Sequence, residues 1–240
     1  MRLLTSRWNL VGRTRAWFSL EWVGEDDLYA QAVSEITPQL FLGCRPSPDG
    51  VLDLRRRGVT HVVSCLEEAQ RSSVDVLSNE FAHLFLPAPD DMMHELTSTR
   101  HDFLTYVDEV MAIDARSKVL VHCEVGVSRS ASLVIARVMR DEQLSFLDSY
   151  ERVRKKRVQV LPNLAFASHL QGYEHELFPE NSTHSPSSLA IYLRRYCSVP
   201  SDIAEIQAAL ERNDYDAPAA LRSMYGGEIP RVVQGTRSAR

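Results

Sequence analysis

A stretch of ten residues constrains the fold of this chain more than any other part of it. The stretch runs from Val121 to Ser130 and reads VHCEVGVSRS. Residues 118–121 are mostly β-branched and apolar, as expected of a buried strand, and residues 133–139 have helical character. The sequence therefore predicts a strand, a tight loop and a helix, within an α/β core whose central sheet is flanked by helices.

The loop inside this stretch has the chemistry of an anion site. A loop between a strand and a helix presents several backbone N–H groups at the helix N-terminus, where phosphate binds readily. Arg129 adds a planar guanidinium that can bind two phosphate oxygens at once. The same field favours the thiolate of Cys123, and a thiolate beneath a bound phosphate can attack phosphorus. A free cysteine is more often a small buried core residue, but Gly126, Ser128 and Arg129 at these offsets favour the reactive interpretation.

The pattern His-Cys-x-x-Gly-x-Ser-Arg-Ser resembles the signature of the dual-specificity protein phosphatases, which act on phosphotyrosine and on phosphoserine or phosphothreonine. The resemblance covers roughly residues 33–178, within a catalytic domain placed at residues 31–178, and implies a central mixed sheet flanked by helices. It also implies a phosphocysteine intermediate, with no metal and no cofactor. Three further segments resemble elements of the family, namely an opening strand at Ile36–Gly43, a second strand at Gly58–Val63 and a Pro-Asn-x-x-Phe element at Pro162–Phe166.

The resemblance also implies roles for individual residues. Cys123 is the nucleophile, Arg129 binds the phosphate, and Ser130 hydrogen-bonds the sulfur so that it leaves more easily in the second step. His122 is expected to orient the loop through a hydrogen bond rather than to transfer protons. The phosphate is expected to bind the loop residues Glu124, Val125, Gly126, Val127, Ser128 and Arg129.

The family carries a general-acid aspartate about thirty residues before the cysteine, on a loop after a strand. Here residues 81–86 resemble that strand, and both Asp90 and Asp91 lie on the loop that follows. Leu96 comes six residues after Asp90, a spacing that resembles the family. We therefore expect Asp90 to be the acid, with Asp91 as the alternative.

Several positions depart from the family pattern without removing a catalytic group. Val125 stands where alanine is frequent, and residues 156–158 stand where Arg-Pro is frequent. The loop interior contains no lysine, whereas phosphoinositide phosphatases with this loop type carry basic residues there. Glu124 near the rim would also repel polyanions. A phosphorylated protein is therefore the expected substrate; the alternatives are a lipid, sugar or RNA phosphate, or a phosphate-binding scaffold without catalysis.

Composition narrows the remaining classes of function. The 240 residues carry a formal net charge of −5, which argues against general nucleic-acid binding. The cysteines lack metal-ligand spacing and fit a reducing compartment; they are Cys44, Cys65, Cys123 and Cys197. No apolar run approaches the ~18 residues of a membrane span. We therefore expect a cytoplasmic protein, with the nucleus as a further location.

Residues 1–30 are read as an N-terminal extension. The first twenty contain four arginines and no acidic residue, together with Trp8, Trp17 and Phe18. Such a composition occurs in mitochondrial transit peptides. A mitochondrial location is therefore an alternative to the cytoplasm, and a solvated or docking extension is the competing interpretation.

Helical patterns alternate with the expected strands. They predict helices over residues 48–57, 97–115, 145–156 and 163–177. A run of basic residues at the end of the third is expected to be a solvated helix face, with an acidic substrate or a nuclear carrier as the alternative ligand. This run consists of Arg152, Arg154, Lys155, Lys156 and Arg157.

The composition shifts after Leu177. Residues 179–188 are rich in Ser, Pro, Asn and Thr and read as a linker. Residues 187–227 then contain three short helical patterns, with Asp216 as N-cap of the third. They faintly resemble the ubiquitin-associated class of three-helix modules, which implies a ubiquitin-like partner, although the Met-Gly-Phe loop of that class is absent. The alternative is that these helices pack on the catalytic domain, because so small a bundle covers its apolar residues poorly.

Overall fold

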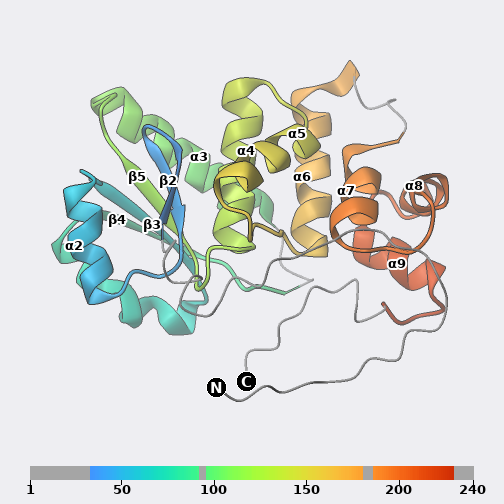
Figure 1. Cartoon of the computed structure of the whole chain (residues 1–240), viewed down its shortest axis with the longest axis horizontal. Helices are drawn as coiled ribbons and strands as arrows, with labels where there is room; N and C mark the ends of the chain where they lie inside the picture. The colour runs from blue at the N-terminus through green and yellow to red at the C-terminus, as the bar shows by residue number, and fades with distance from the viewer. Residues whose placement is uncertain (1–32, 92–95, 181–185, 230–240) are drawn as a thin grey trace, which may run out of the picture. The chain divides into compact units, whose positions relative to one another are not determined.

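The computed structural model describes residues 33–91, 96–180 and 186–229 (Figure 1). The predicted N-terminal extension at residues 1–30 lies outside the described residues, and so do residues 181–185 of the predicted linker. In the part of the chain that the structure describes, no helix combines the length and the apolar character that crossing a membrane requires.

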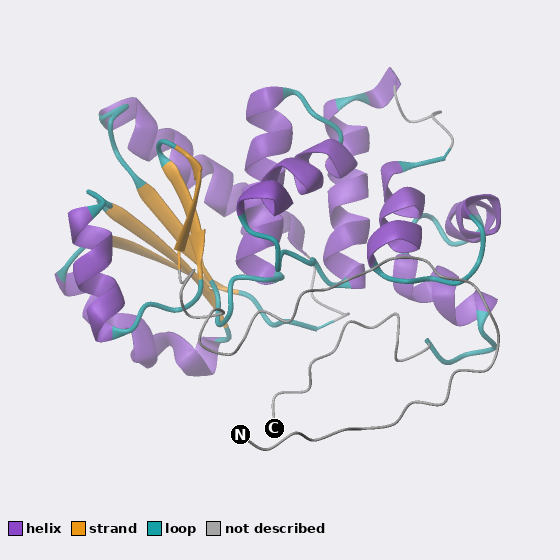
Figure 2. Ribbon diagram, in the orientation of Figure 1, coloured by secondary structure: helices purple, strands orange, loops and turns teal. Residues whose placement is uncertain are grey.

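A five-stranded mixed sheet organises the first part of the fold (Figure 2). Its spatial order is β1-β2-β5-β3-β4; β1 is antiparallel to β2, and the other neighbouring strands are parallel. The strands are β1 (Val33–Thr37), β2 (Leu40–Gly43), β3 (His61–Leu66), β4 (Ala82–Pro87) and β5 (Val119–His122). Because β5 lies in the middle, the loop after it opens between the carboxyl ends of β2 and β3, where sites of parallel sheets usually lie.

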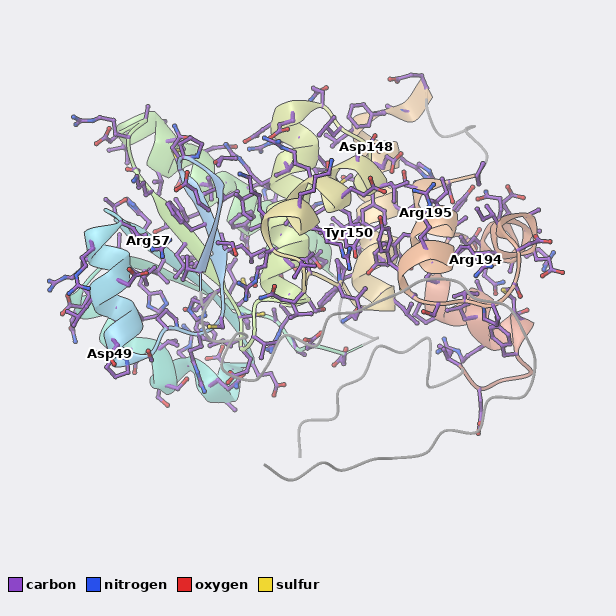
Figure 3. All side chains as sticks on the ribbon, in the orientation of Figure 1. Asp49, Arg57, Asp148, Tyr150, Arg194 and Arg195 are labelled. Atoms are coloured by element: carbon purple, nitrogen blue, oxygen red, sulfur yellow. The ribbon has the colours of Figure 1, made fainter. Side chains whose placement is uncertain are left out.

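Helical segments cover both faces of this sheet. One face carries α2 (Pro48–Arg56), with Asp49 near its start and Arg57 just after its end labelled in Figure 3, and the 3₁₀ segment η1 (Glu68–Asn79). The other face carries α3 (Leu96–Ile113), α4 (Arg129–Glu142) and α5 (Phe146–Lys156), and α6 (Leu164–Leu177) packs on these three helices. The fold-class prediction, a mixed sheet flanked by helices, is confirmed.

The strand β5 shows how the apolar pattern builds these two layers. Its middle residue Leu120 belongs to the core under α2 and η1, whereas its neighbours Val119 and Val121 belong to the core under α3–α6. Successive side chains of a strand point to opposite faces, so a continuous apolar run fits a strand covered on both sides.

Two expectations about strands were wrong. Residues Ile36–Gly43 form no single strand, because a turn at Pro38 and Gln39 separates β1 from β2. Proline lacks a backbone N–H and has a fixed φ, so it interrupts the ladder. The strand expected from Gly58 begins only at His61, because Gly58 has a φ of 75° and follows the end of α2.

The other differences are small. The four helices expected before residue 178 are present, with ends within two residues of the predicted ones. The segment η1 had no clear signal in the sequence. Its buried side chains are Val74 and Leu77, and so short an apolar set does not define a helical period.

Three helices follow the described part of the predicted linker, at the right of Figure 1. They are α7 (Ser188–Tyr196), α8 (Ile203–Glu211) and α9 (Ala217–Met224). The side chain of Asp216 accepts a hydrogen bond from the Ala219 N–H, so Asp216 is the N-cap of α9, as predicted.

Helix α7 packs on α5 and α6, α9 packs on α6, and α8 packs on α7 and α9. The Leu189 N–H at the start of α7 donates to Gln171 Oε1 on α6 at 2.8 Å, and the Ala217 N–H at the start of α9 donates to Ser168 Oγ on α6 at 2.8 Å. Apolar side chains of α7–α9 lie in the same buried core as those of α4–α6. The described residues accordingly belong to one compact unit.

The shared core predicts that the C-terminal helices unfold together with the sheet. Leu221 of α9 is fully buried in that core, so Leu221→Ala should lower the free energy of unfolding by about 2–5 kcal/mol. Urea unfolding followed by circular dichroism should show one transition, shifted as a whole. The control Arg222→Ala alters an exposed neighbour and should leave the midpoint unchanged. Two separate transitions, of which only one shifts, would contradict a shared core.

Candidate active site

The predicted loop lies between β5 and α4. We call residues Cys123–Ser128 the Cys123 loop; it follows His122, the last residue of β5, and ends at Ser128, the N-cap of α4. The first residues of α4 are buried, so the helix N-terminus lies inside the protein rather than in bulk water. A buried N-terminus adds a positive partial charge to the site.

Five consecutive carbonyl groups of the Cys123 loop accept hydrogen bonds from donors outside it. Peptide units are planar, so each carbonyl and the N–H of the following residue point in opposite directions. The donors are His122 Nδ1 to Cys123 at 3.0 Å, Arg45 N to Glu124 at 3.1 Å, Arg157 Nη2 to Val125 at 3.0 Å, Arg157 Nε to Gly126 at 2.9 Å and Leu161 N to Val127 at 2.9 Å. The N–H groups of residues 124–128 therefore point away from these donors, and they form a cup of the kind that suits an anion.

Gly126 is required in this loop for two reasons. Its φ is 68°, in the left-handed region that residues with a side chain rarely adopt. A Cβ placed on it would also lie 2.4 Å from the Gly43 carbonyl oxygen and 2.8 Å from Arg157 Nη2. The close approach of β2 and Arg157 to the loop thus leaves no room for any other residue.

The sulfur of Cys123 lies at the base of the loop and is 1% exposed. It accepts hydrogen bonds from the Gly126 N–H and from the Ser130 hydroxyl, both at 3.2 Å. Two donors directed at one sulfur stabilise negative charge on it. The structure therefore places the sulfur, the Gly126 N–H and the Ser130 hydroxyl together.

Arg129 is buried beside the loop, and its Nη1 donates to the Ala88 carbonyl at 3.3 Å. Its Nε has no hydrogen-bond partner in the described part of the chain and lies 3.5 Å from Asp90 Oδ2. A buried guanidinium N–H without an acceptor is costly. An oxygen of a bound phosphate would supply that acceptor.

Asp90 lies on the loop after β4, next to the Cys123 loop. Its Oδ1 accepts hydrogen bonds from Ser128 Oγ and from Asn163 Nδ2, both at 3.0 Å, and its side chain is 35% exposed. Asn163 Nδ2 also donates to the backbone carbonyl of Asp91, an exposed residue, at 3.3 Å. The Asp90 carboxylate thus contacts both the Cys123 loop and Arg129.

His122 is fully buried, and burial lowers its pKa to about 4, so the imidazole is neutral near pH 7. A carbonyl oxygen only accepts, so the Nδ1 that contacts it carries the hydrogen, and Nε2 must accept from the Ser64 hydroxyl at 2.6 Å. Ser64 in turn contacts His83 Nε2 at 2.8 Å. These contacts fix the orientation and the tautomer of His122 and hold the Cys123 carbonyl out of the cup.

Arg157 contacts the Cys123 loop, although the sequence predicted that its side chain is exposed to solvent. The prediction that the whole basic run is a solvated face is wrong for Arg157, which is 1% exposed. It is the C-cap of α5, directly after Lys156, and its guanidinium reaches the Val125 and Gly126 carbonyls. Lys155 and Lys156 are exposed as expected, and Arg152 pairs with Glu142 at 2.6 Å. Arg154 is half-buried, and its guanidinium lies over the Tyr196 ring, 5.3 Å from the centroid.

Arg45 is a second residue that sequence reasoning missed. Its Nη2 lies 2.9 Å from Glu124 Oε1, and Gln70 Nε2 donates to Glu124 Oε2 at 3.3 Å. The ion pair offsets the charge by which Glu124 was expected to repel polyanions.

Val125 is the loop position that departs from the family pattern. Its side chain is 57% exposed and points away from the core, while its N–H stays in the loop.

The described residues contain no group of three or more His, Cys, Asp or Glu side chains arranged to hold a metal ion. The groups around Cys123 are instead N–H and O–H donors and one guanidinium. This set suits a tetrahedral oxyanion such as phosphate.

Comparison with known families gives the site a context. The family described as "Dual specificity phosphatase, catalytic domain" matches residues 40–176, more than half of the chain. The chain belongs to this family. The match includes the Cys123 loop, Asp90, Arg157 and Asn163, and it ends before α7.

Individual relatives agree with this assignment. Dual specificity protein phosphatase 5 of Rattus norvegicus is 29% identical over 154 residues, which cover 64% of this chain and 38% of the rat protein. Dual specificity protein phosphatase 14 of Mus musculus is 32% identical over 151 residues, covering 62% of this chain and 73% of the mouse protein. The chain thus matches little more than a third of the length of the rat relative.

A solved structure shows the same fold. The human tyrosine phosphatase-like serine/threonine/tyrosine-interacting protein superposes with a TM-score of 0.54 at 27% identity, covering 60% of this chain and 96% of that one. The C-terminal helices α7–α9 lie beyond the residues that the family match contains.

The two hydrogen bonds of Arg157 to the loop lead to a prediction. Arg157→Lys keeps the charge but cannot donate to both carbonyls through one planar fork. We expect the affinity for vanadate, measured by calorimetric titration, to fall about tenfold or more, and the free energy of unfolding to fall by about 2–3 kcal/mol. The control Lys156→Met changes the exposed neighbour and should match the wild type. Unchanged vanadate affinity in Arg157→Lys would show that the loop keeps its shape without that fork.

Proposed function

We propose that this chain is an active dual-specificity phosphatase, which hydrolyses phosphate esters of tyrosine, serine and threonine on proteins through a phosphocysteine intermediate. The observation that carries the proposal is the Cys123 sulfur at the base of a cup of backbone N–H groups, with Arg129 beside it. A nucleophile under a phosphate site has the geometry for attack at phosphorus.

In the first step the cup binds three phosphate oxygens, and the Nε of Arg129 donates to one of them. The Cys123 sulfur attacks phosphorus in line with the ester oxygen. As the S–P bond forms, the P–O bond to the leaving group breaks. Asp90, in its protonated form, donates its proton to the departing oxygen. The position of Asp90 beside Ser128 and Arg129 supports this role.

In the second step a water molecule attacks the phosphorus of phosphocysteine and transfers its proton to Asp90, now ionised. The S–P bond breaks, and phosphate leaves. The Ser130 hydroxyl donates to the sulfur at 3.2 Å and so stabilises the thiolate that departs. His122 takes no part in proton transfer, since both of its ring nitrogens already have partners within the protein.

Proteins are the substrate class that the observations support best. The relatives reported above are named as protein phosphatases, and the loop interior carries no lysine for additional phosphates. Glu124 weighs less in this choice than the sequence suggested, because Arg45 neutralises it. The intact Cys123, Arg129 and Asp90 favour catalysis over a scaffold role.

We also propose a reducing compartment, with the cytoplasm as the leading location. All four cysteines are free thiols. Burial raises the pKa of the Cys44, Cys65 and Cys197 thiols, so these three stay protonated. The proposal includes no ubiquitin-like partner for α7–α9, because their apolar side chains are buried in the core that they share with α4–α6.

The nucleophile provides the first test of the proposed function. Cys123→Ser should abolish turnover of an aryl phosphate, because a serine hydroxyl does not ionise near neutral pH. Vanadate binding should persist, since the loop amides and Arg129 remain. Release of phosphate and calorimetric titration measure the two quantities. Substantial turnover by Cys123→Ser would overturn the mechanism.

The acid is tested by leaving groups of different quality. Asp90→Asn should lower kcat by ~100-fold or more for an alkyl phosphate, whose leaving oxygen needs a proton, and by much less for a nitrophenyl phosphate. Asp91→Asn is the matched control and should leave both rates close to the wild type. The reverse order of effects would assign the acid to Asp91.

A further inference from the structure

The segment between α5 and α6, residues Val160–Asn163, holds both halves of the candidate active site. The Leu161 N–H donates to the Val127 carbonyl of the Cys123 loop at 2.9 Å, and the Asn163 N–H donates to Ser128 Oγ at 3.2 Å. The Asn163 side chain donates to Asp90 Oδ1 at 3.0 Å. A shift of this segment would therefore move the loop and the acid together.

The same segment is held from behind by two tyrosine hydroxyls. Tyr150 of α5 donates to the Val160 carbonyl at 3.2 Å, and Tyr192 of α7 donates to the Pro162 carbonyl at 2.7 Å. Along these four residues, the two kinds of contact alternate. Val160 and Pro162 contact the tyrosines, and Leu161 and Asn163 contact the active site. The shorter of the two supporting contacts comes from α7, which lies beyond the family match at residues 40–176.

Tyr192 is held rigidly in place. It is fully buried among aromatic rings, with centroids 4.9 Å from Tyr150, 5.3 Å from Phe146 and 5.9 Å from Tyr196. Figure 3 shows Tyr150 between α5 and α7, with Arg194 and Arg195 on α7. Burial raises the pKa of Tyr192 well above its ordinary value, so the hydroxyl keeps its proton and remains a donor.

Helix α7 itself is anchored to α6. The Leu189 N–H donates to Gln171, and the Ser188 hydroxyl donates to Glu174 Oε1 at 3.1 Å. The other oxygen of Glu174 accepts from the Phe146 N–H at the start of α5, at 3.0 Å. One carboxylate thus joins the N-termini of α5 and α7, where negative charge is favourable.

We propose that α7 is part of the support of the active site, and that Tyr192 is a positioning residue which acts through the Pro162 carbonyl on Asn163, Ser128 and Asp90. The inference rests on the proposed phosphatase activity. Without the Tyr192 hydroxyl, the buried Pro162 carbonyl loses its donor, and the segment relaxes towards other partners. Displacements of about 1 Å in a catalytic group are enough to lower rates about 100-fold.

The test compares two tyrosines of the same helix. Tyr192→Phe removes the hydroxyl that holds Pro162. Tyr196→Phe removes one from the same aromatic cluster, which donates to Glu151 at 3.0 Å and does not touch the segment. Both full-length variants are assayed with an alkyl phosphate and a nitrophenyl phosphate, at a temperature where near-ultraviolet circular dichroism shows them folded. Vanadate affinity is measured alongside.

Tyr192→Phe should lower kcat for the alkyl phosphate about tenfold, and by less for the nitrophenyl phosphate, because the poor leaving group depends on a well-placed Asp90. Tyr196→Phe should leave the ratio of the two rates unchanged. In a double-mutant cycle, Tyr192→Phe should add little to the effect of Asn163→Ala, since both act through the same contact. A wild-type rate ratio and vanadate affinity in Tyr192→Phe, or full additivity in the cycle, would overturn the proposal.

A measurement on the wild-type protein covers the case in which Tyr192→Phe does not fold. Coupling between two sites is reciprocal, so vanadate bound at the cup should slow amide hydrogen exchange within α7. Unchanged exchange in residues 188–196 would also overturn the proposal. Cys123→Ser, assayed in parallel, separates the two claims: retained turnover there defeats the proposed function, whereas loss there, with equal behaviour of the two tyrosine variants, defeats only the role of Tyr192.

Discussion

The backbone of the Cys123 loop must turn five carbonyls outward at once, and the candidate site depends on this constraint. Carbonyl oxygens repel an anion. In a loop without fixed partners, these carbonyls would accept hydrogen bonds from any nearby donor, including water. Here each of the carbonyls from Cys123 to Val127 has a fixed donor. The N–H groups are consequently arranged before any ligand arrives, and such preorganisation is the largest single contribution to many catalytic sites.

The donors come from parts of the chain that are far apart in sequence. Arg45 follows β2, His122 ends β5, Arg157 is the C-cap of α5, and Leu161 lies between α5 and α6. The sheet brings the first two together because β2 and β5 are neighbours in register, with Gly43 opposite His122. The site is therefore a property of the whole domain, and α7 joins it through Tyr192 and Pro162.

Much of the site could be recognised in the sequence because its parts are local. Cys123, Gly126, Arg129 and Ser130 lie within eight residues, and a strand before them and a helix after them leave few alternatives for the loop. Asp90 required a spacing argument, and the structure places its carboxylate against Ser128 and Arg129. For Arg157 the sequence indicated the wrong environment. A basic residue at the end of a basic helix predicts solvent exposure, whereas Arg157 is buried.

The sequence by itself determined the strand, loop and helix around Cys123, the helices with a clear apolar period, and the family. Local propensity and short-range spacing suffice for these features. Only the tertiary structure decided that Arg157 and Arg45 serve the loop, and that α7–α9 share the core of the domain. Contacts over long separations in the chain depend on how layers pack, and a charged or apolar side chain carries no local sign of its distant partner.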